Sequence, residues 1–153
     1  MILYRITRRI YADDLSGTGS RLYGGRWNSK GKSMVYTASS QALALLEVLV
    51  HLTPLIIPKD YYAVEIEVPD ESILSISSKY LPEDWNDLMP PATIKKIGDT
   101  FLAENKYLLL KVPSAIVPDE FNYLINVNHP LMDEVRVVKK KPFSFDERLV
   151  NRH

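Results

Sequence analysis

The chain has 153 residues, with 19 basic and 19 acidic side chains, three histidines and no cysteine. A chain of this length buries roughly 70% of the surface that its unfolded form exposes, so it can form a core without disulfides or metals. We therefore expect residues 1–153 to form a single domain. The lack of cysteine excludes a disulfide framework, a cysteine-rich zinc finger, an iron–sulfur cluster and a thiol nucleophile, and it suits a reducing cytoplasm.

Charge and hydropathy exclude further classes of protein. A nucleic-acid-binding domain usually carries a basic excess, whereas this chain is neutral and its one basic run, Lys139 to Lys141, is typical of a solvated strand end. The N-terminus has too few consecutive apolar residues for a signal peptide, and no stretch approaches the roughly 20 apolar residues of a membrane span. We therefore expect a cytoplasmic protein that binds neither nucleic acid nor membranes.

The first third of the chain predicts a strand, a glycine-rich loop, a second strand and a helix. Residues 2–10 are apolar at nearly alternate positions, which predicts a strand. Residues 15–31 hold five of the six glycines, and glycine is typical of backbone that adopts positive φ or lies close to a ligand. A short strand is predicted over 33–38, and Ser39 or Ser40 can cap a helix that runs from residue 41 to about residue 52.

The helix at 41–52 is the most informative of the predicted elements. Its sequence, QALALLEVLVHL, is apolar on every side, and this pattern is typical of a helix buried within a domain. Glu47 is its only charged residue and lies between Leu43 and Val50 on one face. Because an unpaired carboxylate is costly to bury, we expect Glu47 to point into the protein or into a cleft.

The rest of the chain alternates strands and helices irregularly. Residues 61–68 alternate apolar and polar side chains, a polar stretch follows through Pro90 and Pro91, and the tail from residue 143 shows no clear pattern. This order favours a mixed α+β domain over a doubly wound parallel sheet. The remaining predicted elements are a helix at about 92–104 and strands at 108–118, 122–127 and 134–140.

Three polar residues stand out by their context: Arg26 in the glycine-rich loop, Tyr36 on the second strand, and Glu47. A guanidinium binds phosphates or carboxylates, a tyrosine offers a ring face and a hydroxyl, and a buried carboxylate can stabilise a developing positive charge. Each residue also has an ordinary structural interpretation. Arg26 can be a turn residue and Tyr36 a core aromatic, while Glu47 can pair with Arg26 or with His51.

Two other kinds of chemistry are poorly supported. Glu47 and His51 lie one helical turn apart and could share a metal, but the chain has three histidines and no HExxH motif, so we expect no metal site. RNA cleavage would require a basic face or a clear pair of catalytic histidine and lysine side chains, which the neutral composition does not suggest.

Several motifs follow one another through nearly the whole chain: YR at 4–5, SGTGS at 16–20, GGRWNSKG at 24–31, VYTASSQALALLEVLVHL at 35–52, VPSAIVPDEFNYLIN at 112–126 and HP at 129–130. In these motifs the chain resembles the RES domain family, the toxin half of RES/Xre bacterial toxin–antitoxin pairs. Residues 55–105 match the family only loosely. The resemblance implies a fold related to ADP-ribosyltransferases and NAD+ as the substrate.

The resemblance also assigns site residues. The family's arginine, tyrosine and glutamate fall on Arg26, Tyr36 and Glu47, and its serine falls on Ser114. The hypothesis is that Glu47 stabilises an oxocarbenium-like ribose and holds its hydroxyl while nicotinamide leaves. Arg26 then neutralises the pyrophosphate, Tyr36 stacks on the nicotinamide ring or orients it, and Ser114 supports Glu47 or the ribose.

The resemblance leaves the acceptor open and implies partners. Water or phosphate as acceptor would destroy NAD+, a protein acceptor would make the chain a mono-ADP-ribosyltransferase, and a catalytically inactive binding module of the same fold is the alternative without catalysis. The implied partner is an Xre-like helix-turn-helix antitoxin that covers the active site. A homodimer is also compatible with the apolar residues at 52–57.

Overall fold

A computed structural model of the chain describes residues 1–52 and 56–150. Within them, a seven-stranded sheet has the strand order β4-β5-β6-β2-β1-β3-β7, so the mixed α+β class predicted from the sequence is confirmed. The strands are β1 (Ile2–Arg8), β2 (Met34–Ala38), β3 (Tyr61–Glu67), β4 (Ile73–Ser75), β5 (Leu109–Pro113), β6 (Phe121–Asn126) and β7 (Arg136–Phe143). The helices are α1 (Thr18–Tyr23), α2 (Gln41–Leu49), α3 (Ala92–Glu104) and α4 (Glu147–Val150), with short 3-10 turns at Arg9–Tyr11, Ser78–Tyr80 and Pro130–Glu134.

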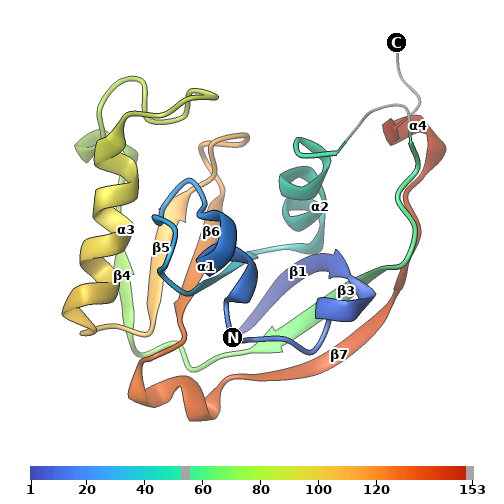
Figure 1. The fold of residues 1–153 in the computed structure, drawn as a ribbon, viewed down its shortest axis with the longest axis horizontal. Helices are drawn as coiled ribbons and strands as arrows, with labels where there is room; N and C mark the ends of the chain where they lie inside the picture. Colours follow the sequence, from blue (N-terminus) through green and yellow to red (C-terminus); the bar gives the residue numbers. More distant parts are fainter. Residues whose placement is uncertain (53–55, 151–153) are drawn as a thin grey trace.

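The sheet has two halves that meet at β1 and β2. The register pairs these two strands only at Tyr4 and Ala38, whereas β1 pairs with β3 along its whole length. Figure 1 shows β5 and β6 standing nearly upright while β1, β3 and β7 run across the molecule. The β4–β5 pair is parallel and the other pairs are antiparallel.

Helices α2 and α3 cover the same face of the sheet, one on each half. Leu43 of α2 packs with Ile6 and Ala38, and Phe101 of α3 packs in a cluster with Leu110 and Leu124. Ala38 is two residues after Tyr36, which is paired with Leu124, and alternate residues of a strand share a face. Ala38 packs with α2, and Tyr36 and Leu124 pack in the cluster of α3, so the same face of β2 and β6 contacts both helices.

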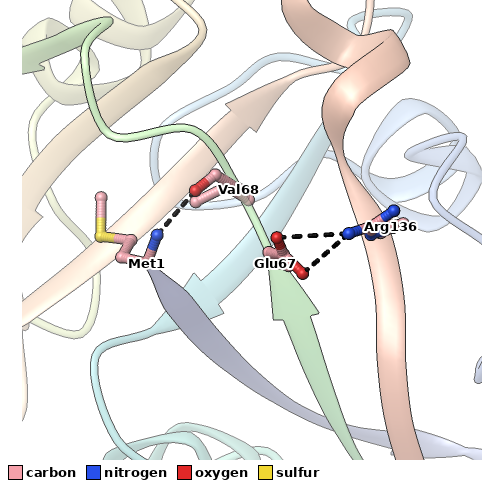
Figure 2. A network of polar contacts seen from close by, with 4 residues as sticks. All are labelled: Met1, Glu67, Val68 and Arg136. Carbon is pink, nitrogen blue, oxygen red and sulfur yellow. Dashed lines mark hydrogen bonds and ion pairs between the residues drawn. The ribbon is translucent and has the colours of Figure 1, made fainter.

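The opposite face is closed by loops. Leu3, Val64 and Ile66 form a buried cluster there with Leu109 and Ile125, and partly buried residues such as Leu15 and Leu131 pack against it. Where β1 begins and β3 ends, the Met1 ammonium donates to the Val68 carbonyl at 2.8 Å, and Arg136 of β7 donates to both carboxylate oxygens of Glu67 (Figure 2). These contacts join β1, β3 and the edge strand β7.

Helix α3 has the predicted bounds, but α2 differs from its prediction. It ends at Leu49 rather than near residue 52, and only Leu43 and Ala44 are buried, while Leu46 and Val50 are exposed at 37% and 57%. The prediction of a helix buried on all sides is therefore wrong, because α2 packs against the sheet on one side only. Part of the predicted apolar interface at 52–57 and the end of the tail lie outside the described residues.

Several elements have no strong pattern in the sequence. Helix α1 lies inside the glycine-rich segment, and β4 is three residues long within the stretch predicted as a polar connection. Among residues 1–52 and 56–150, no helix has the length and apolarity to span a membrane.

Candidate active site

Glu47 receives two hydrogen bonds on one carboxylate oxygen. Helix α2 begins after Ser40, whose hydroxyl accepts from the Leu43 amide at 3.1 Å and so caps the helix. Two turns along, the Glu47 carboxylate faces the ends of β5 and β6. Ser114 Oγ donates to Oε1 at 2.7 Å and Asn122 Nδ2 donates to the same atom at 2.8 Å. These two hydrogen bonds stabilise the partly buried charge.

The backbone fixes the direction of the Ser114 hydroxyl. Ser114 is fully buried just after β5, and its Oγ accepts from the amides of Ile116 and Val117, both at 3.1 Å. A hydroxyl has one proton to donate. Because both amides already donate to Oγ, that proton goes to Glu47, and the serine acts as an oriented donor toward the carboxylate.

Tyr36 directs its hydroxyl into the glycine-rich loop. The hydroxyl donates to Asn28 Oδ1 at 2.6 Å and accepts from the Trp27 amide at 3.1 Å. Burial raises the pKa of the Tyr36 hydroxyl above its usual range, with the nearby Asp99 charge adding to the shift, while the Trp27 amide and the Arg26 charge oppose it. The phenol therefore stays neutral, and its oxygen is committed to holding the loop.

The loop that carries Arg26 is held on several sides. Asn28 Nδ2 donates to the carbonyls of Ser20, Ser29 and Lys32 at 3.0–3.2 Å, so this buried amide closes the loop on itself. Asp99 of α3 accepts from the Ser29 amide at 2.9 Å and from its hydroxyl at 2.6 Å. The loop is thus attached to α3.

Glycine is required at two of these contacts. A Cβ at Gly25 would lie 2.4 Å from the Tyr36 hydroxyl oxygen, and a Cβ at Gly98 of α3 would lie 1.6 Å from the Trp27 carbonyl oxygen. Both contacts are too short for any side chain, so the loop, Tyr36 and α3 pack together only with glycine at these positions.

Arg26 donates through Nη1 to the carbonyls of Trp85 and Asp87, at 3.1 and 2.9 Å. These residues belong to the segment between β4 and α3. Within residues 1–52 and 56–150 Arg26 forms no ion pair, so the pairing of Glu47 with Arg26 considered above is not present. Glu47 bonds to Ser114 and Asn122 instead, and no contact with His51 is found among the described residues.

The strand register brings the candidate residues to one face of the sheet. Tyr36 is paired with Leu124, and Ala38 with Asn122, so Tyr36 and Asn122 point to the same side, which is also the side of α2 and Glu47. Arg5, from the YR motif, is on the opposite face with Leu3 and donates to the Asp14 carbonyl at 2.8 Å. Arg5 is therefore separate from this group.

Sequence reasoning missed Asn122. The only local signal is an amide side chain in a largely apolar and aromatic strand that ends in a second asparagine, Asn126, and its partner Glu47 is 75 residues away in the chain. Among the described residues, no group of three or more His, Asp and Glu side chains is placed to bind a metal ion. A shallow hollow between β4 and α3, lined by Thr93, Ile97 and Phe101 among others, contains none of the candidate residues.

The arrangement places opposite charges around an aromatic residue. The Glu47 carboxylate lies on α2 and accepts hydrogen bonds from Ser114 and Asn122 on Oε1 only. The Arg26 guanidinium lies on the loop whose Trp27 amide donates to the Tyr36 hydroxyl. Such a face can bind a ligand that has anionic groups at one part and develops positive charge at another.

Comparison with known proteins gives one consistent result. The family model of the RES domain matches residues 2–146. The chain is 40% identical over 155 residues to Toxin Res of Photorhabdus laumondii, covering 98% of this chain and 97% of that protein. It is 42% identical over 149 residues to a Prs ADP-ribosylating toxin of Sphingobium sp., covering 95% of this chain and 92% of that protein.

The fold has a counterpart among solved structures. The crystal structure of the MbcT–MbcA toxin–antitoxin complex of M. tuberculosis contains a chain that matches with a TM-score of 0.77 at 19% identity, covering 94% of this chain and 84% of that one. At this identity the match shows a shared fold.

Proposed function

Because this chain belongs to the RES domain family, we propose that it is the toxin of a bacterial toxin–antitoxin pair and cleaves the bond between nicotinamide and ribose in NAD+. The observation that carries the proposal is the Glu47 carboxylate, whose Oε1 accepts from Ser114 and Asn122. Within the described residues no hydrogen bond reaches Oε2. One oxygen is therefore anchored and the other is available to a substrate.

The proposed reaction requires stabilisation of positive charge. As the bond between nicotinamide nitrogen and ribose C1′ breaks, its electron pair leaves with nicotinamide, which becomes neutral, and positive charge develops on C1′ and the ring oxygen. The fixed carboxylate of Glu47 lowers the energy of this state and accepts a hydrogen bond from the neighbouring ribose hydroxyl. Water or phosphate then bonds to C1′, and water loses a proton in the process.

Arg26 and Tyr36 act on other parts of the substrate. Because Arg26 uses Nη1 for the carbonyls of Trp85 and Asp87, its remaining N–H groups can donate to the pyrophosphate. The Tyr36 hydroxyl is occupied by Trp27 and Asn28, so what Tyr36 offers to nicotinamide is its ring face, while its hydroxyl positions the Arg26 loop. Ser114 acts through Glu47.

Transfer of ADP-ribose to a protein is the second candidate. It is favoured by the Sphingobium relative, whose name describes an ADP-ribosylating toxin, and it uses the same bond cleavage with a protein side chain as acceptor. The segment between β4 and α3 reaches Arg26 and exposes Leu88 and Met89, so it is well placed to select an acceptor.

The proposed partner is an Xre-like helix-turn-helix antitoxin that covers the Glu47 face. The structural counterpart was solved as a toxin–antitoxin complex, and a cell that makes an NAD+-consuming enzyme must restrain it. We also propose a cytoplasmic location, where NAD+ is found, and self-association through the apolar residues at 52–57, of which Ile56 is exposed.

The test of the proposed function is nicotinamide release. Purified protein without any partner is mixed with NAD+ in buffers with and without phosphate, and nicotinamide is measured by chromatography. Release in the absence of a protein acceptor supports NAD+ destruction, and a requirement for phosphate identifies a phosphorylase. Release that occurs only after a cell lysate is added, together with labelling of one protein by ADP-ribose, would support the second candidate instead.

A further inference from the structure

The side chain of Asn122 has one satisfied end and one unsatisfied end. Its Nδ2 donates to Glu47 Oε1 at 2.8 Å, while its Oδ1 is buried and has no hydrogen-bond partner among the described residues. A buried amide oxygen without a donor is unfavourable, and native proteins rarely keep one without a functional or structural reason.

The Glu47 charge accounts for the orientation of this amide. Rotating the amide by half a turn would place Oδ1 against the carboxylate oxygen, where two acceptors repel each other, and would leave the N–H groups unpaired. The observed orientation gives the carboxylate a donor and leaves the amide oxygen unpaired. The amide orientation therefore stabilises the Glu47 charge, and its cost is an unpaired Oδ1 on Asn122.

The sheet holds Asn122 in place from both sides. It is paired with Ala38 of β2 and with Val112 of β5, so its backbone is fixed in the sheet. Ala38 is small and buried beneath α2, which leaves room for the amide to reach Glu47. Ser114 reaches the same oxygen from the loop after β5.

We propose that Asn122 is a positioning residue that, together with Ser114, fixes Oε1 of Glu47 and thereby directs Oε2 toward the substrate. The inference rests on the proposed function, because it assigns Asn122 to the reaction carried by Glu47. Two donors of different origin that converge on one oxygen restrict rotation of the carboxylate about its last bond. Asn122 does not contact NAD+ in this account and acts only through Glu47.

The experiment compares Asn122→Ala, and the similarly sized Asn122→Asp, with wild type in nicotinamide release from NAD+. We expect kcat to fall about 10- to 100-fold in Asn122→Ala, which is the loss typical when a side chain that orients a metal ligand by a hydrogen bond is removed. KM for NAD+ should change less than about threefold. Asn122→Asp retains the shape but places a second carboxylate against Glu47, so it should lose at least as much activity.

A double variant tests whether Asn122 acts through Glu47. In a Glu47→Ala background the carboxylate is absent, so adding Asn122→Ala should reduce the residual kcat by less than about twofold. A further loss as large as in wild type would mean that Asn122 contributes independently of Glu47, and it would overturn the inference.

Asn126 provides the matched control. It is on the same strand, donates to Asn105 Oδ1 at 2.6 Å and accepts from the Asn128 amide at 3.1 Å, with no contact to Glu47. Asn126→Ala, checked for folding by thermal unfolding, should keep kcat within about twofold of wild type. With an active wild type, an unchanged kcat in Asn122→Ala, or equal losses in both asparagine variants, would overturn this inference alone. A wild type that releases no nicotinamide would overturn it together with the proposed function.

Discussion

Single polar side chains that are far apart in the sequence meet at the candidate site. The need for Glu47 to be satisfied could be predicted, because it is the only charge in an apolar helix. Its partners Ser114 and Asn122, 67 and 75 residues away, could not be found from local pattern. Ser114 was named only through the family resemblance, and Asn122 not at all. The catalytic roles of Arg26, Tyr36, Glu47 and Ser114 remain predictions.

The Tyr36 hydroxyl should contribute to stability as well as to substrate binding. Tyr36→Phe leaves the buried Trp27 amide and Asn28 Oδ1 without their partner, so we expect the free energy of unfolding to fall by about 1–3 kcal/mol. The ring is retained, so kcat should change little, while KM for NAD+ rises because the Arg26 loop is less well held. Chemical denaturation and steady-state kinetics measure the two effects. Unchanged stability would contradict the role given to the hydroxyl.

Arg26 should act mainly on substrate binding. Arg26→Ala removes a cation from the proposed pyrophosphate site, and the loss of hydrogen bonds to a charged group should raise KM for NAD+ about 10- to 100-fold. Arg21→Ala is the control, because it removes the same charge from an exposed position on α1 and should leave KM unchanged. An equal rise in KM in both variants would indicate a general electrostatic effect rather than a specific contact.

At the scale of secondary structure elements, sequence pattern was reliable where one face of an element is apolar and its ends are marked. Helix α3 begins after two prolines and ends at Glu104, where the next residue, Asn105, adopts the left-handed conformation, and the predicted bounds agree with the structure. For α2, composition alone suggests full burial, but the helix packs against the sheet on one side only and exposes Leu46 on the other. Strand β4 has only three residues and could not be recognised.

The packing of α3 on the Arg26 loop gives a prediction at this scale. Gly98→Ala places a methyl group 1.6 Å from the Trp27 carbonyl oxygen, so α3 and the loop must separate. Overpacking of this kind costs about 1–3 kcal/mol in stability, and we expect KM for NAD+ to rise as Arg26 shifts.

Gly19→Ala is the control for this variant. A Cβ there meets nothing within 4 Å, and Gly19 is in α1. Its stability should be unchanged or higher by up to about 1 kcal/mol, since alanine favours helix more than glycine does. Denaturant titration measures the free energy of unfolding of both variants and of wild type. A Gly98→Ala protein as stable as wild type would show that α3 does not clamp the loop.

At the scale of the whole molecule, the family resemblance drawn from motifs is confirmed by the RES family model over residues 2–146, and the mixed α+β architecture is confirmed by the fold. Motifs such as GGRWNSKG carry this information because they must satisfy several contacts at once. Asn28 alone accepts from Tyr36 and donates to the carbonyls of Ser20, Ser29 and Lys32. In the proposed function the acceptor is selected by loops such as the one carrying Leu88, which the motifs do not cover.

Expression of the chain without an antitoxin should therefore harm a bacterial host. We expect cellular NAD+ to fall before growth stops, because loss of the substrate is the cause of the arrest in this account. Growth and extracted NAD+ are followed after induction of wild type and of the Arg26→Ala variant. Growth arrest with normal NAD+ would indicate modification of a protein target rather than depletion of NAD+.

Nicotinamide release from wild type and from Glu47→Gln, measured at equal protein concentrations, tests whether Glu47 carries an NAD+-cleaving reaction. Glutamine keeps the size of the side chain, and its carbonyl can still accept from Ser114 and Asn122, so only the charge is removed. We predict steady release by wild type and a rate at least about 100-fold lower in the folded variant. Release by Glu47→Gln within a few-fold of wild type would contradict this role of Glu47.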